Sequence, residues 1–148
     1  QMNPVVKVWE PDKQGTVDQF PIVCTTFRLS EHYQTGNLTR NQPWLAELQP
    51  YMFVEIGEEL AAEKGIKNGQ EVIVSSTRGE VRAYAMVTKR WKPFNLGGQK
   101  VHQIGMPWNF GYRGIATGDI ANKLTPHIGD ANTMIPEYKA FLVDVKGV

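Results

Sequence analysis

The chain has 148 residues, of which 41% are apolar and 21% are charged, a balance that allows one globular domain with a hydrophobic core. A formal net charge of +1, without a basic cluster interleaved with aromatic residues, argues against a nucleic-acid partner. No apolar run is long enough to cross a bilayer, and the single cysteine excludes an internal disulfide and a cysteine-cluster metal site.

The N-terminal segment carries two prolines and a glycine without hydrophobic periodicity, so we predict that residues 1–19 are an irregular entry segment or linker. Because the chain begins with Gln1 and its first methionine is second, we expect a piece cut from a longer protein. Residues 20–148 are predicted to form the domain. They open with an apolar strand over 20–26 and a polar loop or short helix over 30–42.

Two helices are predicted in the first half of the domain. The first covers residues 43–48, with a proline in its first turn. The second covers residues 58–64, where acidic residues begin the helix and Lys64 ends it, in accord with the helix dipole. Gly65 stops this helix, and a buried strand is expected over 51–56 between the two.

The rest of the chain is predicted to be mostly strands and loops, and Asp119 is expected to cap a short helix through Leu124. The predicted strands are 71–76 and 80–87, which pair as a hairpin, then 101–105 and 138–146. The predicted loops are 89–100, 106–118 and 125–137. About six short strands with few helices indicate a mainly β fold, a closed or nearly closed barrel with short helical excursions.

The segment from Cys24 to Gly36 gathers hydroxyl groups, a guanidinium and an imidazole directly after the first strand. Loops at strand ends commonly carry functional residues. The planar donor fork of Arg28 and the short-range donors of Thr25 and Thr26 suit a phosphate or another anion. Cys24 continues the apolar strand, so we interpret it as a small buried side chain.

No catalytic machinery is visible in the sequence. The three histidines lack the spacing of metal ligands, and neither a nucleophile elbow nor a phosphate-binding loop motif is present. The chain is therefore better suited to hold a ligand than to transform one. A purely structural interpretation stays open for each candidate: Arg28 solvated or salt-bridged, His32 in a turn, Trp108 in packing, Asn122 on a helix surface and Lys139 in a surface ion pair.

Three blocks of sequence carry a family resemblance that runs from Phe20 to Val145. The blocks are Cys24–Gly36 with Thr39–Asn41, then Gly65–Gly79, then Gly118–Pro126 with Gly129–Thr133 and Ile135–Ala140. The chain resembles the C-terminal molybdopterin-dinucleotide-binding domain of formate dehydrogenase large subunits, within the dimethyl-sulfoxide-reductase family. The block Val101–Trp108 is similar to the formate dehydrogenase branch in particular.

The resemblance implies a double-psi β-barrel that binds molybdopterin guanine dinucleotide between two stretches of chain. It assigns the following side chains to the cofactor: Thr25, Thr26 and Arg28 to pyrophosphate or ribose oxygens; His32, Gln34 and Thr35 to the pterin or its phosphate; Asn122 and Lys139 to the pterin from the other side; and Trp108 to the wall of the cleft. Such a ligand needs donors spaced along a cleft on rigid strands.

The same resemblance implies a role in a larger enzyme of anaerobic respiration that oxidises formate to carbon dioxide. Molybdenum or tungsten would be ligated by residues upstream of this chain, so Cys24 is not a ligand and the isolated chain is expected to be inactive. The implied partners are the remainder of the large subunit and an iron–sulfur electron-transfer subunit. The similar branch is exported to the periplasm, and cytoplasmic relatives exist.

Two alternatives follow from the same sequence. One is the equivalent domain of another molybdopterin oxidoreductase, such as a polysulfide, thiosulfate or formylmethanofuran enzyme. The other is a double-psi barrel that serves as a protein-interaction module, as in the amino-terminal domains of some ATPases. The module would show an exposed apolar patch and no affinity for guanine nucleotides or pterins.

Overall fold

A computed structural model describes residues 15–130, 132–136 and 138–148. Most of the predicted entry segment, residues 1–14, lies outside the described residues. The described elements in chain order are β1 (Ile22–Phe27), η2 (Thr39–Asn41), α1 (Pro43–Leu48), β2 (Phe53–Gly57), α2 (Glu58–Lys64), β3 (Glu71–Ser75), β4 (Glu80–Thr88), β5 (Phe94–Leu96), β6 (Gln99–Pro107), η3 (Ala121–Lys123) and β7 (Phe141–Gly147).

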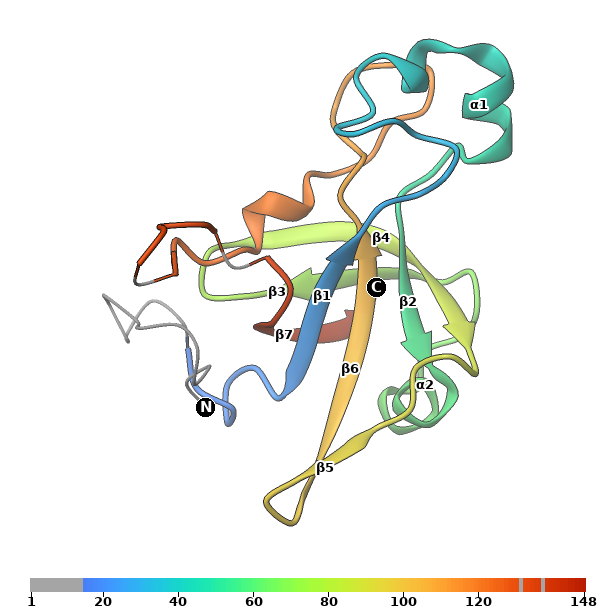
Figure 1. The fold of residues 1–148 in the computed structure, drawn as a ribbon. Helices are drawn as coiled ribbons and strands as arrows, with labels where there is room; N and C mark the ends of the chain where they lie inside the picture. Colours follow the sequence, from blue (N-terminus) through green and yellow to red (C-terminus); the bar gives the residue numbers. More distant parts are fainter. Residues whose placement is uncertain (1–14, 131, 137) are drawn as a thin grey trace.

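Six of these strands close into a barrel, which confirms the predicted fold class. The order is β1-β7-β3-β4-β2-β6, and β6 pairs with β1 to complete the ring (Figure 1). The pairs β1–β6 and β2–β4 are parallel, and the other pairs in the ring are antiparallel. These two parallel pairs within a closed ring are the arrangement of a double-psi β-barrel.

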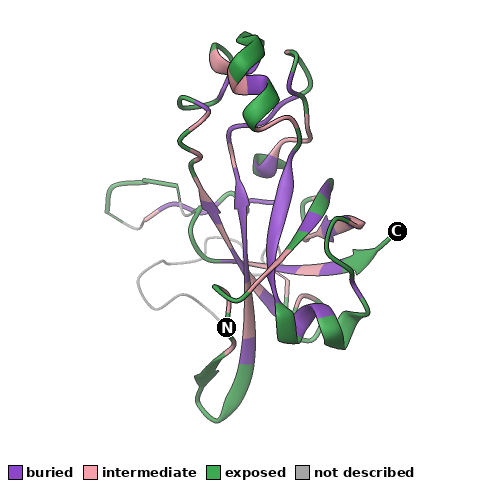
Figure 2. Cartoon of the chain, turned by 90° about the vertical axis from the view of Figure 1, so that its right-hand side faces the viewer, coloured by how far each residue is buried: buried purple, intermediate pink, exposed green. Residues whose placement is uncertain are grey.

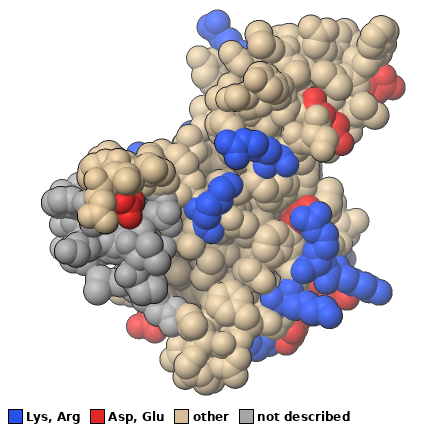
Figure 3. All heavy atoms as spheres, in the orientation of Figure 1, with Lys and Arg blue, Asp and Glu red and all other residues tan. Residues whose placement is uncertain are grey.

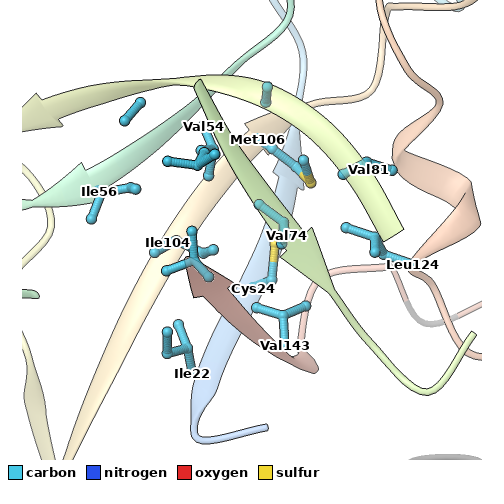
Figure 4. Packing of buried hydrophobic residues seen from close by; sticks show 14 of the residues in the cluster. Ile22, Cys24, Val54, Ile56, Val74, Val81, Ile104, Met106, Leu124 and Val143 are labelled. Atoms are coloured by element: carbon cyan, nitrogen blue, oxygen red, sulfur yellow. The ribbon is translucent and has the colours of Figure 1, made fainter. Parts of the chain in front are cut away.

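The barrel interior is filled by side chains that alternate along the strands. In β1 the buried positions are Ile22, Cys24 and Thr26, and the side chains between them are partly exposed. Figure 4 shows Cys24 of β1 gathered with Val74 of β3 and Val143 of β7, and all three are fully buried. Complete burial of an aliphatic side chain contributes about 1.5–3 kcal/mol, so this interior supplies the main stabilisation of the domain.

The α2 helix is bounded as its sequence predicts. Glu58 and Glu59 lie in the first turn and Lys64 lies in the last. Gly65 adopts the left-handed conformation with φ of 66°, and its N–H bonds the carbonyls of Ala61 and Ala62 to end the helix.

Several sequence predictions are wrong, and the last strand, for example, begins at Phe141 rather than at Tyr138. Residues 94–96 form β5 rather than a loop, and β6 extends over Gln99–Pro107 rather than 101–105, because Gly97 and Gly98 take positive φ and close a tight hairpin. Asp119 is not the N-cap residue of a helix, because Ile120 occupies that position and no side chain caps it. Its carboxylate accepts the N–H of Ile120 at 3.0 Å, and only the short η3 follows.

Two long excursions leave the barrel at one end. Because β1 and β6 run parallel and Phe27 pairs with Pro107, the segments after them emerge side by side. Residues 28–51, which include η2 and α1, and residues 108–118 together form a projection that we call the lobe (Figure 1). Figure 2 shows buried residues concentrated in the barrel and mainly exposed residues on α1.

Candidate functional site: a basic cleft at the end of β1

The first two side chains of the site come from the parallel pair of strands. Arg28 follows β1 and Trp108 follows β6, and the Arg28 guanidinium carbon lies 4.9 Å from the centre of the Trp108 ring. A cation at this distance is attracted by the ring face. The indole Nε1 of Trp108 is buried and has no hydrogen-bond partner among the described residues, so a buried donor is left unused beside Arg28.

Lys139 reaches the same strand end from the C-terminal part of the chain. The Tyr138 carbonyl accepts hydrogen bonds from the Thr26 N–H at 3.3 Å and from the Thr26 hydroxyl at 2.9 Å. The Lys139 ammonium in turn donates to the Thr26 carbonyl and lies 3.5 Å from the Thr26 hydroxyl oxygen. The segment before β7 is therefore fixed against the end of β1, next to Arg28.

The two cations lie close enough to affect each other. Burial lowers the pKa of Lys139, and the positive charge of Arg28 lowers this pKa further. Within the described residues neither Arg28 nor Lys139 forms an ion pair, whereas Lys64 and Lys123 bind Asp144 and Asp119 at 2.6 and 2.5 Å. Figure 3 shows basic side chains in the middle of this face that stand apart from acidic ones. Among the described residues, the cleft thus presents two positive charges without a paired carboxylate.

A cavity of about 610 Å³ lies beyond Tyr138. Asn122 of η3 and Arg78 of the β3–β4 turn line it together with His127 and Tyr138. Tyr138 lines this cavity and its carbonyl is bonded to Thr26, so the cavity lies one residue along the chain from Lys139; its lining does not include Arg28, Trp108 or Lys139. The two stretches singled out in the sequence therefore meet at one side of the barrel rather than at opposite ends.

The loop after Arg28 is held by one buried amide, that of Asn109. Its Oδ1 accepts the Leu29 N–H at 3.0 Å, and its Nδ2 donates to the carbonyls of His32 at 3.0 Å and Gln34 at 2.6 Å. Gln34 has φ of 54°, a left-handed backbone that is uncommon for a residue other than glycine. The side chains of Gln34 and Thr35 remain exposed as a result.

His32 is placed differently from the other candidates. Its ring is 2% exposed, and Nε2 lies 2.9 Å from the Gln49 carbonyl while Nδ1 lies 3.3 Å from the Thr39 hydroxyl. A carbonyl only accepts, so Nε2 carries the proton and Nδ1 accepts from Thr39. Both ring nitrogens are thus engaged inside the protein, and a contact of His32 with the cofactor stays a prediction.

Thr25 and Thr26 face opposite sides of β1. Thr26 is buried and uses its hydroxyl for the Tyr138 carbonyl, whereas Thr25 is partly exposed on the outer face. Their predicted contacts with the cofactor also stay predictions. The structure leaves Thr25 the more accessible hydroxyl of the two.

Sequence reasoning missed two residues that shape the site. One is Asn109, described above, and the other is Arg40, whose buried guanidinium donates to the carbonyls of Gly111, Arg113 and Ala116. Neither residue has a spacing or a charged neighbour that predicts burial. Their roles depend on partners about 70 residues away in sequence, which only the fold brings close.

The described residues contain no group of three or more His, Cys, Asp or Glu side chains that could hold a metal ion. The thiol of Cys24 is fully buried in the barrel, and burial raises its pKa strongly, so it is a packing residue as the sequence predicts. Among the same residues, no helix has the length and apolar character needed to span a bilayer.

Comparison with known proteins identifies the family. The model of the family described as "Molydopterin dinucleotide binding domain" matches residues 22–142, so the chain belongs to this family of cofactor-binding domains. Curated relatives include the formate dehydrogenase subunit alpha of Megalodesulfovibrio gigas, 50% identical over 145 residues, and the nitrate-inducible formate dehydrogenase major subunit of Escherichia coli, 52% identical over 147 residues.

Both relatives are much longer than this chain. The alignments cover 97% of this chain but 14% of each relative, so the chain spans about a seventh of their length. A solved structure with the same fold is the acetylene hydratase from Pelobacter acetylenicus, with a TM-score of 0.71 and 14% identity over 89% of this chain and 19% of that chain. This likeness supports the barrel assignment.

Proposed function

We propose that this chain is the molybdopterin guanine dinucleotide-binding domain of a formate dehydrogenase large subunit, and that the basic cleft holds the cofactor. One observation carries the assignment of the cleft. Arg28 and Lys139 meet at the end of β1 without a carboxylate partner among the described residues, and Trp108 adds an unused buried donor.

The chemistry of these donors fits the cofactor. A pyrophosphate carries two negative charges, and two adjacent cations supply charge-assisted hydrogen bonds that a neutral ligand would not need. Exposed amides at Gln34 and Asn122 can bond carbonyl and amine groups of the heterocycles. Tyr138 connects the two parts of the site, because its carbonyl is bonded to Thr26, which precedes Phe27 and Arg28, and the same residue lines the cavity beside Asn122.

The individual roles follow from accessibility. Arg28 and Lys139 bind the pyrophosphate, Thr25 supplies a further hydroxyl donor, and Trp108 forms the wall of the cleft. Gln34, Thr35 and Asn122 hydrogen-bond the polar edges of the ligand. Thr26 and His32 contribute mainly by fixing the backbone that presents these groups, since their side-chain bonds lie within the protein.

In the complete enzyme the cofactor would carry molybdenum or tungsten and supply the redox chemistry for oxidising formate to carbon dioxide. The residues of this chain bind and orient that cofactor. We propose the remainder of the large subunit and an iron–sulfur subunit as partners. We propose the periplasm as the compartment, and fractionation of cells that express the full-length protein would distinguish it from the cytoplasm.

Formate dehydrogenases are favoured over other molybdopterin enzymes by the degree of similarity. The Desulfovibrio desulfuricans periplasmic nitrate reductase is 33% identical over 90 residues, which cover 58% of this chain, whereas the Escherichia coli formate dehydrogenase-O major subunit is 47% identical over 149 residues. The substrate pocket of the full-length protein lies outside this chain. An assay of formate oxidation and of nitrate reduction by the full-length protein would therefore decide between the two kinds of enzyme.

The test is Arg28→Ala in the full-length large subunit, with metal and pterin content measured after purification. Loss of one charge-assisted contact costs about 1.5–3 kcal/mol, so we expect retention of the cofactor to weaken by about 10- to 100-fold. Arg82→Ala is the matched control, because Arg82 is an exposed arginine of β4 that pairs with Glu71 at 3.2 Å outside the cleft. Wild-type cofactor content in Arg28→Ala, with an unchanged melting temperature, would remove Arg28 from the site.

A further inference from the structure

The lobe displays large apolar side chains that no described residue covers. Trp44 is 85% exposed and Leu48 is 69% exposed, and their spacing of four residues places both on one face of α1. The lobe also exposes further large side chains by 62% to 76%, namely Tyr33, Leu38, Tyr51, Tyr112 and Ile115. We call these seven residues the apolar surface of the lobe.

This surface continues onto the barrel. The rings of Tyr51 and Tyr84 lie 5.7 Å apart, and Tyr84 is an outward-facing residue of β4 with 46% exposure. Met86 follows two positions later on the same face of the strand and is 40% exposed. Large contiguous apolar surfaces on soluble domains mark contact sites for other protein surfaces.

The composition of the lobe is that of an interface rather than of a solvated loop. Of the 35 residues in the lobe five are charged, namely Arg28, Glu31, Arg40, Glu47 and Arg113, and Arg40 is buried. Interface cores are depleted of charged residues and enriched in tyrosine and tryptophan. A loop of this size on a free surface would carry more charge, given 21% for the whole chain.

The apolar side chains are also held in place. Arg40 ties the two halves of the lobe together, since its guanidinium binds three carbonyls of residues 111–116 and its own carbonyl accepts the N–H groups of Ile115 and Ala116 at 2.9 and 3.1 Å. Tyr51 and Thr117 form a further bridge between the halves. A rigid display of this kind lowers the entropic cost of docking.

We infer that the apolar surface of the lobe is an interface buried by the remainder of the same large-subunit polypeptide. This occupant follows from length, because the formate dehydrogenase relatives hold 86% of their residues outside the part that this chain matches. The inference rests on the proposed function in one respect, namely that the full-length protein is such a subunit. The two sites share no residue, since none of the seven residues of the apolar surface pairs with Arg28 and Trp108 or lines the cavity beside Asn122.

Hydroxyl-radical footprinting of the full-length large subunit tests this inference. Trp44 and Tyr112 should be modified about tenfold more slowly in the native subunit than after denaturation, because a packed interface excludes water. Phe94 on the projecting β5 is the control and should stay reactive. Native reactivity of Trp44 within about twofold of the denatured value would overturn the inference. Protection that depends on protein concentration, or on an added second subunit, would overturn it as well.

A pair of substitutions makes the test independent of the footprint. Trp44→Glu should expose the junction between this domain and the rest of the subunit to limited proteolysis, whereas Trp44→Phe should not, because phenylalanine preserves an apolar contact. Cofactor content measured on the same samples separates the two proposals. If Trp44 is accessible while cofactor content still falls in Arg28→Ala, the interface is refuted and the cleft is not. If Trp44 is protected while cofactor content is unchanged in Arg28→Ala, the cleft is refuted and the interface is not.

Discussion

Removal of the Asn109 side chain should loosen the loop that carries the cleft. The amide is fully buried and makes three hydrogen bonds, to the Leu29 N–H and to the carbonyls of His32 and Gln34. At about 1 kcal/mol net for each bond, Asn109→Ala should lower the free energy of unfolding by about 3 kcal/mol. That loss is a large part of the stability of a small domain.

A second substitution at the same position tests the hydrogen bonds of Asn109 with little change in side-chain volume. Asn109→Asp keeps an acceptor for Leu29 but turns a carboxylate oxygen toward the His32 and Gln34 carbonyls, which lie 3.0 and 2.6 Å from the present Nδ2. Because these groups repel, Asn109→Asp should be less stable than Asn109→Ala at neutral pH, and the gap should narrow as acid protonates the carboxylate.

Urea denaturation of this chain, followed by tryptophan fluorescence, measures both variants. Asn95→Ala is the control, since the Asn95 side chain accepts one bond from Gly98 in an exposed hairpin and its loss should cost about 1 kcal/mol or less. The reasoning fails if the free energy of unfolding of Asn109→Ala lies within about 0.5 kcal/mol of the wild-type value. The three buried hydrogen bonds of Asn109 could not then be holding the loop.

Two further outcomes are expected. Affinity for pyrophosphate should fall as pH rises through the lowered pKa of Lys139, and the fall should begin below the ordinary value of 10.5. Lys139→Arg should remove this dependence, because arginine stays charged. Calorimetric titration with pyrophosphate measures both proteins, and the same pH profile for both would contradict the prediction. Gly36→Ala should be clearly less stable than Gly97→Ala in thermal unfolding. Both glycines have positive φ, but only a Cβ at Gly36 would overlap the Asn109 carbonyl oxygen. Equal losses of stability in the two variants would show that backbone conformation alone sets the cost.

The sequence by itself determined the elements whose causes are local. The α2 helix has its dipole partners and its glycine stop within eight residues, and the β3–β4 hairpin has alternating apolar positions about a short turn. Such signals depend only on neighbours along the chain, so they survive without knowledge of the fold. The resemblance in the three blocks added the barrel type and the family, which the comparisons confirm.

Only the tertiary structure decided which polar side chains are accessible to a ligand and which are bonded to the protein's own backbone. Arg28 and His32 lie four positions apart with similar sequence surroundings, yet Arg28 is exposed in the cleft and the His32 ring is enclosed by Thr39, Gln49 and Phe110. Burial of a side chain depends on packing between segments distant in sequence, and no local pattern encodes it. For the same reason, the role of Asn109, which follows β6 and holds the loop after β1, depends on these two parallel strands lying side by side.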